Sequence, residues 1–280
     1  MKKRKILISC TTLLLLLFVT NSCKMIDRAN KHFKYFEYAK AIPQYKKVLE
    51  RDSTNIEAWT KLGDCYRLNN QTIEAEACYQ RAVKDPNIKS IYKLYYAQMM
   101  INNVNYAGVH EWIVDYMKSE PNDTRAAMLD SGVTHMDDFK GDKDKYQVNK
   151  LNINTSDGEY GPVLYREGLV FTSSRKDESR KNRSDLWTGK RYYSIYYSKG
   201  GGTNFETPTV FLKGIQTKYN NSSVSFSSDG NEMAVTRNNV ENEKRLVSQD
   251  SSVKLKIYTS ILKDGNWLQA LPFQYNSDLY

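Results

Sequence analysis

The stretch WTKLGDCYRLNNQTIEAEACYQRAVKDP, residues 59–86, decides the architecture of the first half of the chain. Its large apolar and small residues recur first at the i, i+3, i+4 and i+7 spacing of one helix face. These residues are Trp59, Leu62, Gly63 and Tyr66. A second helical face follows Asn69-Asn70 and ends at Asp85-Pro86, because proline cannot continue a helix. The stretch therefore predicts two helices joined by a short turn.

The same pattern recurs before and after this stretch, at the offset that separates Gly63 from Ala97, here called the helical period. The two predicted helices resemble a tetratricopeptide repeat, a helix–turn–helix unit with this period. The positions that match the family are Trp59, Leu62, Gly63, Tyr66, Ala75, Tyr79 and Ala82. Shifts by one helical period reach Ala29, Ala41, Tyr45 and Ala97. We therefore expect an α-solenoid over residues 23–140, with three repeats and a capping remnant that begins near Thr124.

The resemblance also implies a binding surface. In this family, the first helix of each pair lines a concave groove. Transferred position by position, this gives four candidate groove contacts: Asp64, Arg67, Gln98 and Asn102. They are mixed polar residues without an evident ligand code. Two alternatives stay open, namely helices that serve only as a scaffold and a groove that is buried against the next domain.

The second half of the chain shows a different repeat. After a charged hinge at residues 141–149, the apolar spacing shortens towards two, which predicts β-strands over residues 150–280, with a first turn at Glu167-Gly168. The segment IYYS at 195–198 recurs as IYTS at 257–260, and the offset between them is here called the sheet period. A four-stranded unit that repeats at about 60 residues is typical of a propeller blade. The charged loops between the second and third strands of each unit are expected on one face, as contact loops or as solvated surface.

SVSFSSDGNEMAVTRNN, residues 223–239, resembles the PD40 or TolB-type propeller signature, in which F-S-x-D-G precedes a strand. Residues 161–175 are a degenerate copy that lacks the aspartate. The expected fold is therefore α then β: a tetratricopeptide α-solenoid followed by an incomplete PD40/WD40-like β-propeller. It contains two blades and, from residue 275, the start of a third. Because a closed propeller needs about four blades, we expect the chain to be the N-terminal part of a longer protein.

Residues 1–22 have the features of an export signal. Four cations at positions 2–5 precede an apolar run at 6–19, which is shorter than the roughly 20 residues of a membrane-spanning helix. Thr20-Asn21-Ser22-Cys23 resembles a bacterial lipobox, so Cys23 is the expected lipidation site. Cys10 also follows lipobox-like residues, but cleavage there would leave the leucines in the product. A plain secretory signal is the alternative. Inner-membrane retention and surface display of bacterial lipoproteins use acidic residues after the lipidated cysteine. Because the residue at this position is Lys24, we expect the periplasmic face of the outer membrane.

Composition narrows the function classes. The formal net charge of +9 falls to +5 without residues 1–22 and is spread along the chain, which argues against nucleic-acid binding. Cys65 and Cys78 are expected as two buried thiols on neighbouring helices, with a disulfide as the alternative. The sequence has no Walker or nucleophile-elbow motif and no histidine cluster. We therefore expect no enzyme activity, cofactor or metal.

The order of lipobox, tetratricopeptide repeats and PD40 propeller resembles the OmpA-family lipoproteins of Bacteroidetes, which include a component of type IX secretion and gliding. The resemblance implies a docking lipoprotein that contacts envelope proteins through its groove and propeller face. It implies peptidoglycan binding only through a C-terminal domain that this sequence does not contain. The alternatives are a SusD-like glycan-capture lipoprotein and the N-terminal part of an exported, propeller-gated peptidase.

Overall fold

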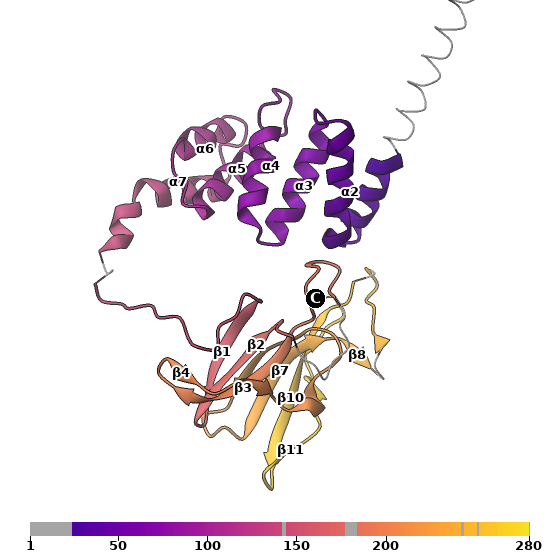
Figure 1. Cartoon of the computed structure of the whole chain (residues 1–280), viewed down its shortest axis with the longest axis vertical. Coiled ribbons are helices and arrows are strands. Elements are labelled where there is room, and N and C mark those ends of the chain that lie inside the picture. The colour runs from indigo at the N-terminus through magenta and orange to yellow at the C-terminus, as the bar shows by residue number, and fades with distance from the viewer. Residues whose placement is uncertain (1–23, 142–143, 177–183, 242–243, 251, 280) are drawn as a thin grey trace, which may run out of the picture. The chain divides into compact units, whose positions relative to one another are not determined.

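The computed structural model divides the chain into two compact units (Figure 1). It describes residues 24–141, 144–176, 184–241, 244–250 and 252–279. The first unit contains the described residues up to Tyr146 together with Leu186–Gly189. The second unit contains Gln147–Asp185 and the remainder from Lys190. The predicted order of a helical region followed by a β-rich region is confirmed.

The first unit is a row of helical hairpins. A helix at residues 24–34 precedes α2 (Tyr38–Arg51), α3 (Ile56–Leu68), α4 (Thr72–Ala82), α5 (Ile91–Asn102), α6 (Val109–Met117), α7 (Thr124–Thr134) and the 3₁₀ turn η1 (Met136–Lys140). From α2 to α7, each helix packs against the next along the chain, as expected of a solenoid. In the described ranges, no helix is both long enough and apolar enough to span a membrane.

The core of this unit follows the helical period. Equivalent small positions in the second helix of each hairpin are fully buried at Ala41, Ala75 and Val109. The same is true one turn later at Tyr45, Tyr79 and Ile113. The first helices contribute Ala29, Gly63 and Ala97, where neighbouring helices approach closely. A Cβ atom on Gly63 would lie only 2.6 Å from Cε1 of Tyr79, so this position requires glycine.

Each hairpin turns through one residue with a left-handed backbone. The φ angles are 58° at Phe36, 56° at Asn70 and 61° at Val104, and these residues are again one helical period apart. Asparagine tolerates this conformation well, whereas a β-branched valine is strained in it. Leu186–Gly189 also packs within this unit, where the Trp187 ring stacks on Phe36 with 5.8 Å between centroids.

The second unit contains two antiparallel sheets and a short hairpin. The first sheet has the order β1 (Glu159–Tyr165), β2 (Gly168–Ser173), β3 (Ser194–Gly201), β4 (Asn204–Phe205), and β5 (Thr209–Val210) also pairs with β3. The short 3₁₀ turn η2 (Lys213–Ile215) leads to the second sheet. Its order is β6 (Asn221–Phe226), β7 (Glu232–Asn238), β10 (Leu255–Lys263), β11 (Asn266–Trp267), and β12 (Leu271–Pro272) pairs with β10. The hairpin consists of β8 (Val240–Glu241) and β9 (Lys244–Arg245).

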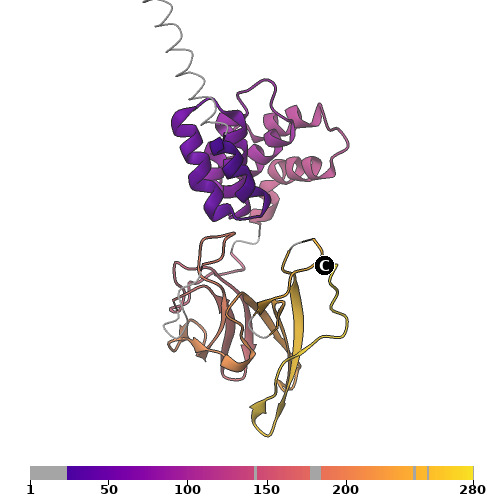
Figure 2. The same cartoon turned by 90° about the vertical axis from the view of Figure 1, so that its right-hand side faces the viewer.

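The two sheets pack face to face within the second unit (Figure 2). The space between them is filled by a shared apolar core. Strand β6 contacts β1, β2 and β3 of the first sheet. The first sheet contributes Val170 and Ile195 to this core, and the second contributes Val235, Met233 and Tyr258. One face of the first sheet is thus covered by the second sheet.

Hydrogen bonds repeat between the sheets with the sheet period found in the sequence. The Ile195 carbonyl accepts from the Phe211 amide at 2.9 Å, and the Ile257 carbonyl accepts from the Phe273 amide at the same distance. The Gln216 side-chain oxygen accepts from the Ile195 amide at 3.0 Å, as the Asn276 oxygen does from Ile257, although the separation of these two acceptors is slightly shorter than the sheet period. The second sheet is therefore a structural copy of the first, and the segment after β12 repeats the connection that leads out of the first sheet.

The turn between β1 and β2 differs from the sequence expectation. The sequence predicts it at Glu167-Gly168, but it lies at Arg166-Glu167, and Gly168 begins β2. Gly168 packs so closely on β3 that a Cβ atom there would lie 2.3 Å from the Ser198 carbonyl oxygen. Arg166 takes the left-handed conformation instead, with φ of 51°.

Candidate functional site

The predicted groove residues of the second repeat form a polar cluster with tyrosines. The Tyr79 hydroxyl donates to Asp64 Oδ1 at 2.8 Å and accepts from Arg67 Nε at 3.0 Å. The Arg67 guanidinium lies 3.9 Å above the Tyr95 ring, a cation–π arrangement. Asp64 is only 7% exposed, and burial raises the pKa of Tyr79. Asp64 therefore ties α3 to α4 and holds the guanidinium in place.

The hydrogen bond of the Asp64 carboxylate can be compared with the equivalent positions in the other two repeats. Asn30 is the equivalent residue one repeat earlier, and its side-chain oxygen accepts from the Tyr45 hydroxyl at 2.6 Å. One repeat later the equivalent residue is Gln98, but Ile113 replaces the tyrosine and offers no hydroxyl. Within the described part of the chain, Gln98 has no side-chain hydrogen bond. Asn30 and Asp64 are thus hydrogen-bonded within the first two repeats, whereas the side-chain amide of Gln98 in the third repeat is free to bind a partner.

A continuous face of α5 presents the remaining candidates. Tyr95, Gln98 and Asn102 are spaced i, i+3 and i+7, so they lie on one side of the helix. Gln98 is half-buried and Asn102 is exposed, and Arg67 reaches this face from α3 through Tyr95. Side-chain amides both donate and accept, so this face can pair with the backbone of an extended peptide. A role in binding stays a prediction for all four residues.

Sequence reasoning missed several members of this surface. Tyr92 and Tyr95 complete the aromatic lining, and burial raises the pKa of Tyr92 to about 12. The Nζ atom of Lys61 on α3 lies 4.3 Å from the centroid of the Phe33 ring, which belongs to the preceding hairpin. A shift of Asp64 by one helical period would have identified Asn30. The helical period also relates the two cation–π contacts, because Phe33 and Arg67 are one period apart, as are Lys61 and Tyr95.

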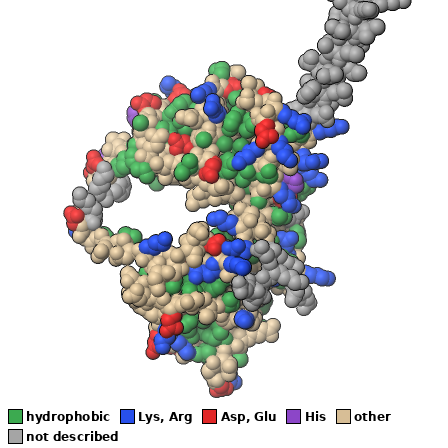
Figure 3. All heavy atoms as spheres, in the orientation of Figure 1, with side chains coloured by type: hydrophobic (Ala, Val, Ile, Leu, Met, Phe, Trp, Pro, Cys, Tyr) green, Lys and Arg blue, Asp and Glu red, His purple; other side chains and the backbone are tan. Residues whose placement is uncertain are grey.

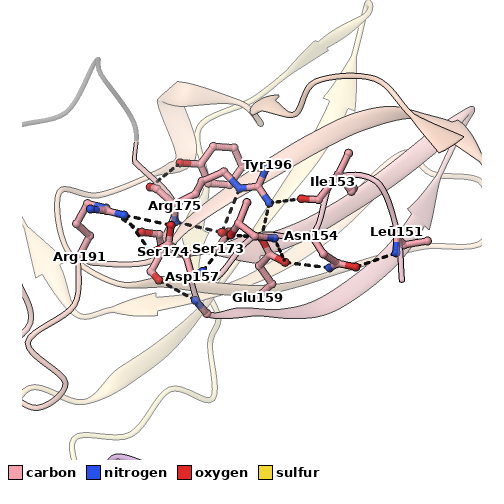
Figure 4. A network of polar contacts seen from close by, with 12 residues as sticks. Leu151, Ile153, Asn154, Asp157, Glu159, Ser173, Ser174, Arg175, Arg191 and Tyr196 are labelled. Atoms are coloured by element: carbon pink, nitrogen blue, oxygen red, sulfur yellow. Dashed lines mark hydrogen bonds and ion pairs between the residues drawn. The ribbon is translucent and has the colours of Figure 1, made fainter. Parts of the chain in front are cut away.

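A second polar network lies at the start of the first sheet (Figure 4). Arg175 Nη2 contacts Glu159 Oε1 at 2.6 Å and donates to the Ile153 carbonyl at 3.1 Å. Arg191 pairs with Asp157 at 3.0 Å. Glu159 also accepts from the side chains of Asn154 at 2.9 Å and Thr155 at 2.8 Å. The network fastens residues 151–158 to β1, β2 and the loop before β3.

The electrostatics of this network indicate a structural role. Burial acts to raise the pKa of Glu159, but hydrogen bonds from Asn154 and Thr155 and the charge of Arg175 outweigh it and hold the pKa below its usual range. The second sheet repeats the motif, since Arg237 donates to the carbonyl of Ile215, one sheet period after Ile153. A motif that recurs in both sheets is typical of a fold determinant.

Other predicted residues are also placed by the structure. Cys65 on α3 and Cys78 on α4 are buried, free thiols, and burial raises the pKa of each to about 12, so the prediction of buried thiols on neighbouring helices is confirmed. Cys23 lies outside the described residues. Across the described ranges, no three His, Cys, Asp or Glu side chains gather as a metal site.

Comparison with known proteins supports the helical repeats. Residues 44–77 match the model of the tetratricopeptide repeat family. Together with the helical hairpins, this match shows the predicted tetratricopeptide-repeat region. A search of curated proteins finds no match.

A search of solved structures returns tetratricopeptide-repeat proteins that match part of this chain. YrrB, described as having an unusual peptide-binding site, has 19% identity over 43% of this chain and 61% of its own, with a TM-score of 0.38. This chain thus spans less than two thirds of YrrB. The Sgt2 domain from Aspergillus fumigatus has 17% identity over 49% of this chain and 91% of its own, with a TM-score of 0.37. The TPR2B domain of yeast Sti1, in complex with pHsp70, has 14% identity over 42% of this chain and 98% of its own, with a TM-score of 0.36.

Proposed function

We propose that this chain is a non-enzymatic docking lipoprotein of the bacterial envelope, which binds protein partners through its tetratricopeptide repeats. The observation that carries the proposal is the α5 face. The first two repeats use their polar groove position internally, through Asn30 with Tyr45 and Asp64 with Tyr79. The third repeat leaves Gln98 and Asn102 free beside Tyr95 and Arg67. Free amides next to an aromatic ring and a cation suit an extended peptide segment.

Photo-crosslinking in cells tests this face. A photoreactive residue at Asn102 should crosslink to a discrete envelope protein, and Gln98→Ala should weaken that product. The matched control places the same residue at Lys84, which is also exposed and lies just after α4. Equal crosslinking from both positions, or none from either, would argue against docking at the α5 face.

The proposed anchor is a lipid on Cys23, which would hold the protein at the periplasmic face of the outer membrane. Support comes from the short apolar run and the small residues before Cys23, together with Lys24 after it. Three acyl chains bury enough methylene groups for stable anchoring, at about 0.8 kcal/mol each. Cys23→Ala should move the protein out of the outer-membrane fraction. Cys10→Ala is the control and should leave the distribution unchanged.

We further propose that the two sheets are blades of a β-propeller of the PD40 type. Support comes from the hydrogen bonds that repeat with the sheet period and from the outer face of the second sheet. There the side chains of β10 alternate, and Leu255, Ile257 and Ile261 are exposed. A hollow of about 490 Å³ lies on this sheet, lined in part by Ala234, Thr259, Ile261, Leu268 and Leu271. A third sheet of the same design would cover these residues.

The fragment of residues 150–280 tests the propeller directly. Two blades cannot close a ring, so the fragment should self-associate or lack a cooperative thermal transition. A monomer that melts cooperatively would argue against the propeller. In this proposal, the loops at the end of the sheets contact further envelope proteins, in a complex of the type IX secretion or gliding class. A link to peptidoglycan would require a domain that is not in this sequence.

A further inference from the structure

The first described helix, residues 24–34, has an apolar face that packs into the core and a charged face that is exposed to solvent. Met25, Ile26, Ala29 and Phe33 pack into the core of the helical unit. The residues exposed on the other side are Lys24, Asp27, Arg28, Lys31, Lys34 and, just beyond the helix, Tyr35. At 100° per residue these six positions form one stripe, here called the basic stripe. It carries four cations and one anion.

Among the residues that the structure describes, no acidic side chain forms an ion pair with the cations of the basic stripe. Throughout the described ranges, none of these four cations takes part in a side-chain hydrogen bond either. By contrast, Lys93 pairs with Asp115 at 2.5 Å, and Lys254 pairs with Asp250 at the same distance. Figure 3 shows Lys and Arg side chains gathered on the edge of the helical unit where this helix lies. A stripe of unpaired cations beside an exposed tyrosine is a surface for an anionic partner.

We propose that the basic stripe lies on an anionic phospholipid surface and orients the helical unit against the membrane. The inference rests on the proposed anchoring, because a lipid on Cys23 would bring Lys24 and the following turns to the headgroups. Basic residues next to a membrane anchor are attracted by anionic lipids, and tyrosine is enriched at the headgroup level. Since the apolar face is already used in the core, the contact is electrostatic and the helix does not insert.

A vesicle-binding assay tests this with a chain that starts at residue 24, which keeps the helical core and removes any acyl chain. The chain should bind vesicles of phosphatidylglycerol and phosphatidylcholine in equal parts, and not vesicles of phosphatidylcholine alone. Raising the salt concentration from 0.1 to 1 M shortens the screening length from about 10 to 3 Å and should abolish binding. No binding to the anionic vesicles, or equal binding to both compositions, would overturn the proposal.

Matched charge variants locate the surface. The combined variant Lys24→Gln, Arg28→Gln, Lys31→Gln and Lys34→Gln should weaken binding by roughly 600-fold, because each of the four cations near an anionic surface contributes about fivefold. The control removes the same charge from the exposed side chains Arg81, Lys84, Lys89 and Lys263 and should change binding by about twofold at most. Equal losses in both variants would overturn the proposal.

Two further measurements distinguish a loss of charge from altered folding, and lipid binding from a general attraction to polyanions. The combined variant Lys24→Arg, Lys31→Arg and Lys34→Arg should retain binding, because it keeps every positive charge of the basic stripe; loss of binding in this variant would overturn the proposal. A single-stranded oligonucleotide that binds as tightly as the vesicles and is lost in the same variant would indicate general polyanion attraction and overturn the lipid assignment. Because the chain carries no lipid, these results do not depend on Cys23→Ala, which tests anchoring in cells.

Discussion

The helical unit and the sheet unit use their internal repeats in different ways. In the helical unit, Tyr45 and Tyr79 are one repeat apart and both are fully buried. In the sheet unit, Ile195 is fully buried, whereas its counterpart Ile257 is 41% exposed. A helical hairpin completes its core with its neighbours along the row, but a sheet has two faces that each need a cover. Loss of equivalent apolar contacts should therefore cost similar free energies in the helices and unequal free energies in the sheets.

The largest expected effect is at Ile195. Ile195→Ala removes side-chain volume from the core between the two sheets and should lower the free energy of unfolding by about 2–5 kcal/mol. Ile257→Ala, one sheet period later, should cost less than about 1 kcal/mol, because its side chain is already in contact with water. Urea titration of the two variants measures both values. Equal losses would mean that the outer face of the second sheet is covered after all.

The next effect concerns the close helix contact at Gly63. A methyl group there would meet the Tyr79 ring, so Gly63→Ala should destabilise the helical unit by about 1–3 kcal/mol. Gly132→Ala is the matched control, since it lies within α7 with no atom within 4 Å of the added Cβ. The control should stabilise by about 0.5–1 kcal/mol through helix propensity. Thermal unfolding followed by circular dichroism distinguishes the two, and a neutral Gly63→Ala would refute the close packing.

Removal of one hydroxyl compares two equivalent positions within the helical unit. Tyr79→Phe removes the shortest hydrogen bond to the buried Asp64 carboxylate, whose contacts with Tyr92 and Arg67 are longer at 3.5 Å, and should cost about 1.5–3 kcal/mol. Tyr45→Phe breaks a bond to the neutral amide of Asn30 and should cost about 1 kcal/mol. Urea titration measures the difference. A smaller loss for Tyr79→Phe than for Tyr45→Phe would show that Asp64 is not held by this hydroxyl.

The smallest effect lies in the hairpin turns. Val104 is exposed and has the left-handed backbone that Asn70 has one repeat earlier. Val104→Asn should relieve strain and raise the free energy of unfolding by about 1 kcal/mol. The reciprocal change, Asn70→Val, should lower it by a similar amount. A melting-temperature shift of the same sign for both variants would contradict the equivalence of the turns.

The helical unit could be predicted closely from the sequence, because residues one helical period apart occupy equivalent buried positions. The predicted small and aromatic residues Ala29, Ala41, Tyr45 and Ala97 are all buried. Engagement of Asp64 could not be predicted, since it depends on a hydroxyl from the neighbouring helix. The β1–β2 turn was misplaced by one residue, because Gly168 is needed in β2 for the close approach to β3. Such contacts are non-local, and local turn residues do not encode them.

The two sheets stack face to face in the register set by the sheet period, and a third sheet should continue this stack. To test the stacking, a second copy of residues 218–272 is placed after Leu279, which continues that register. Thiol labelling of Ile257→Cys is then measured in a chain that starts at residue 24, with and without the added copy. This stacking predicts rapid labelling without the added copy and strong protection with it. The same labelling rate in both chains would contradict it.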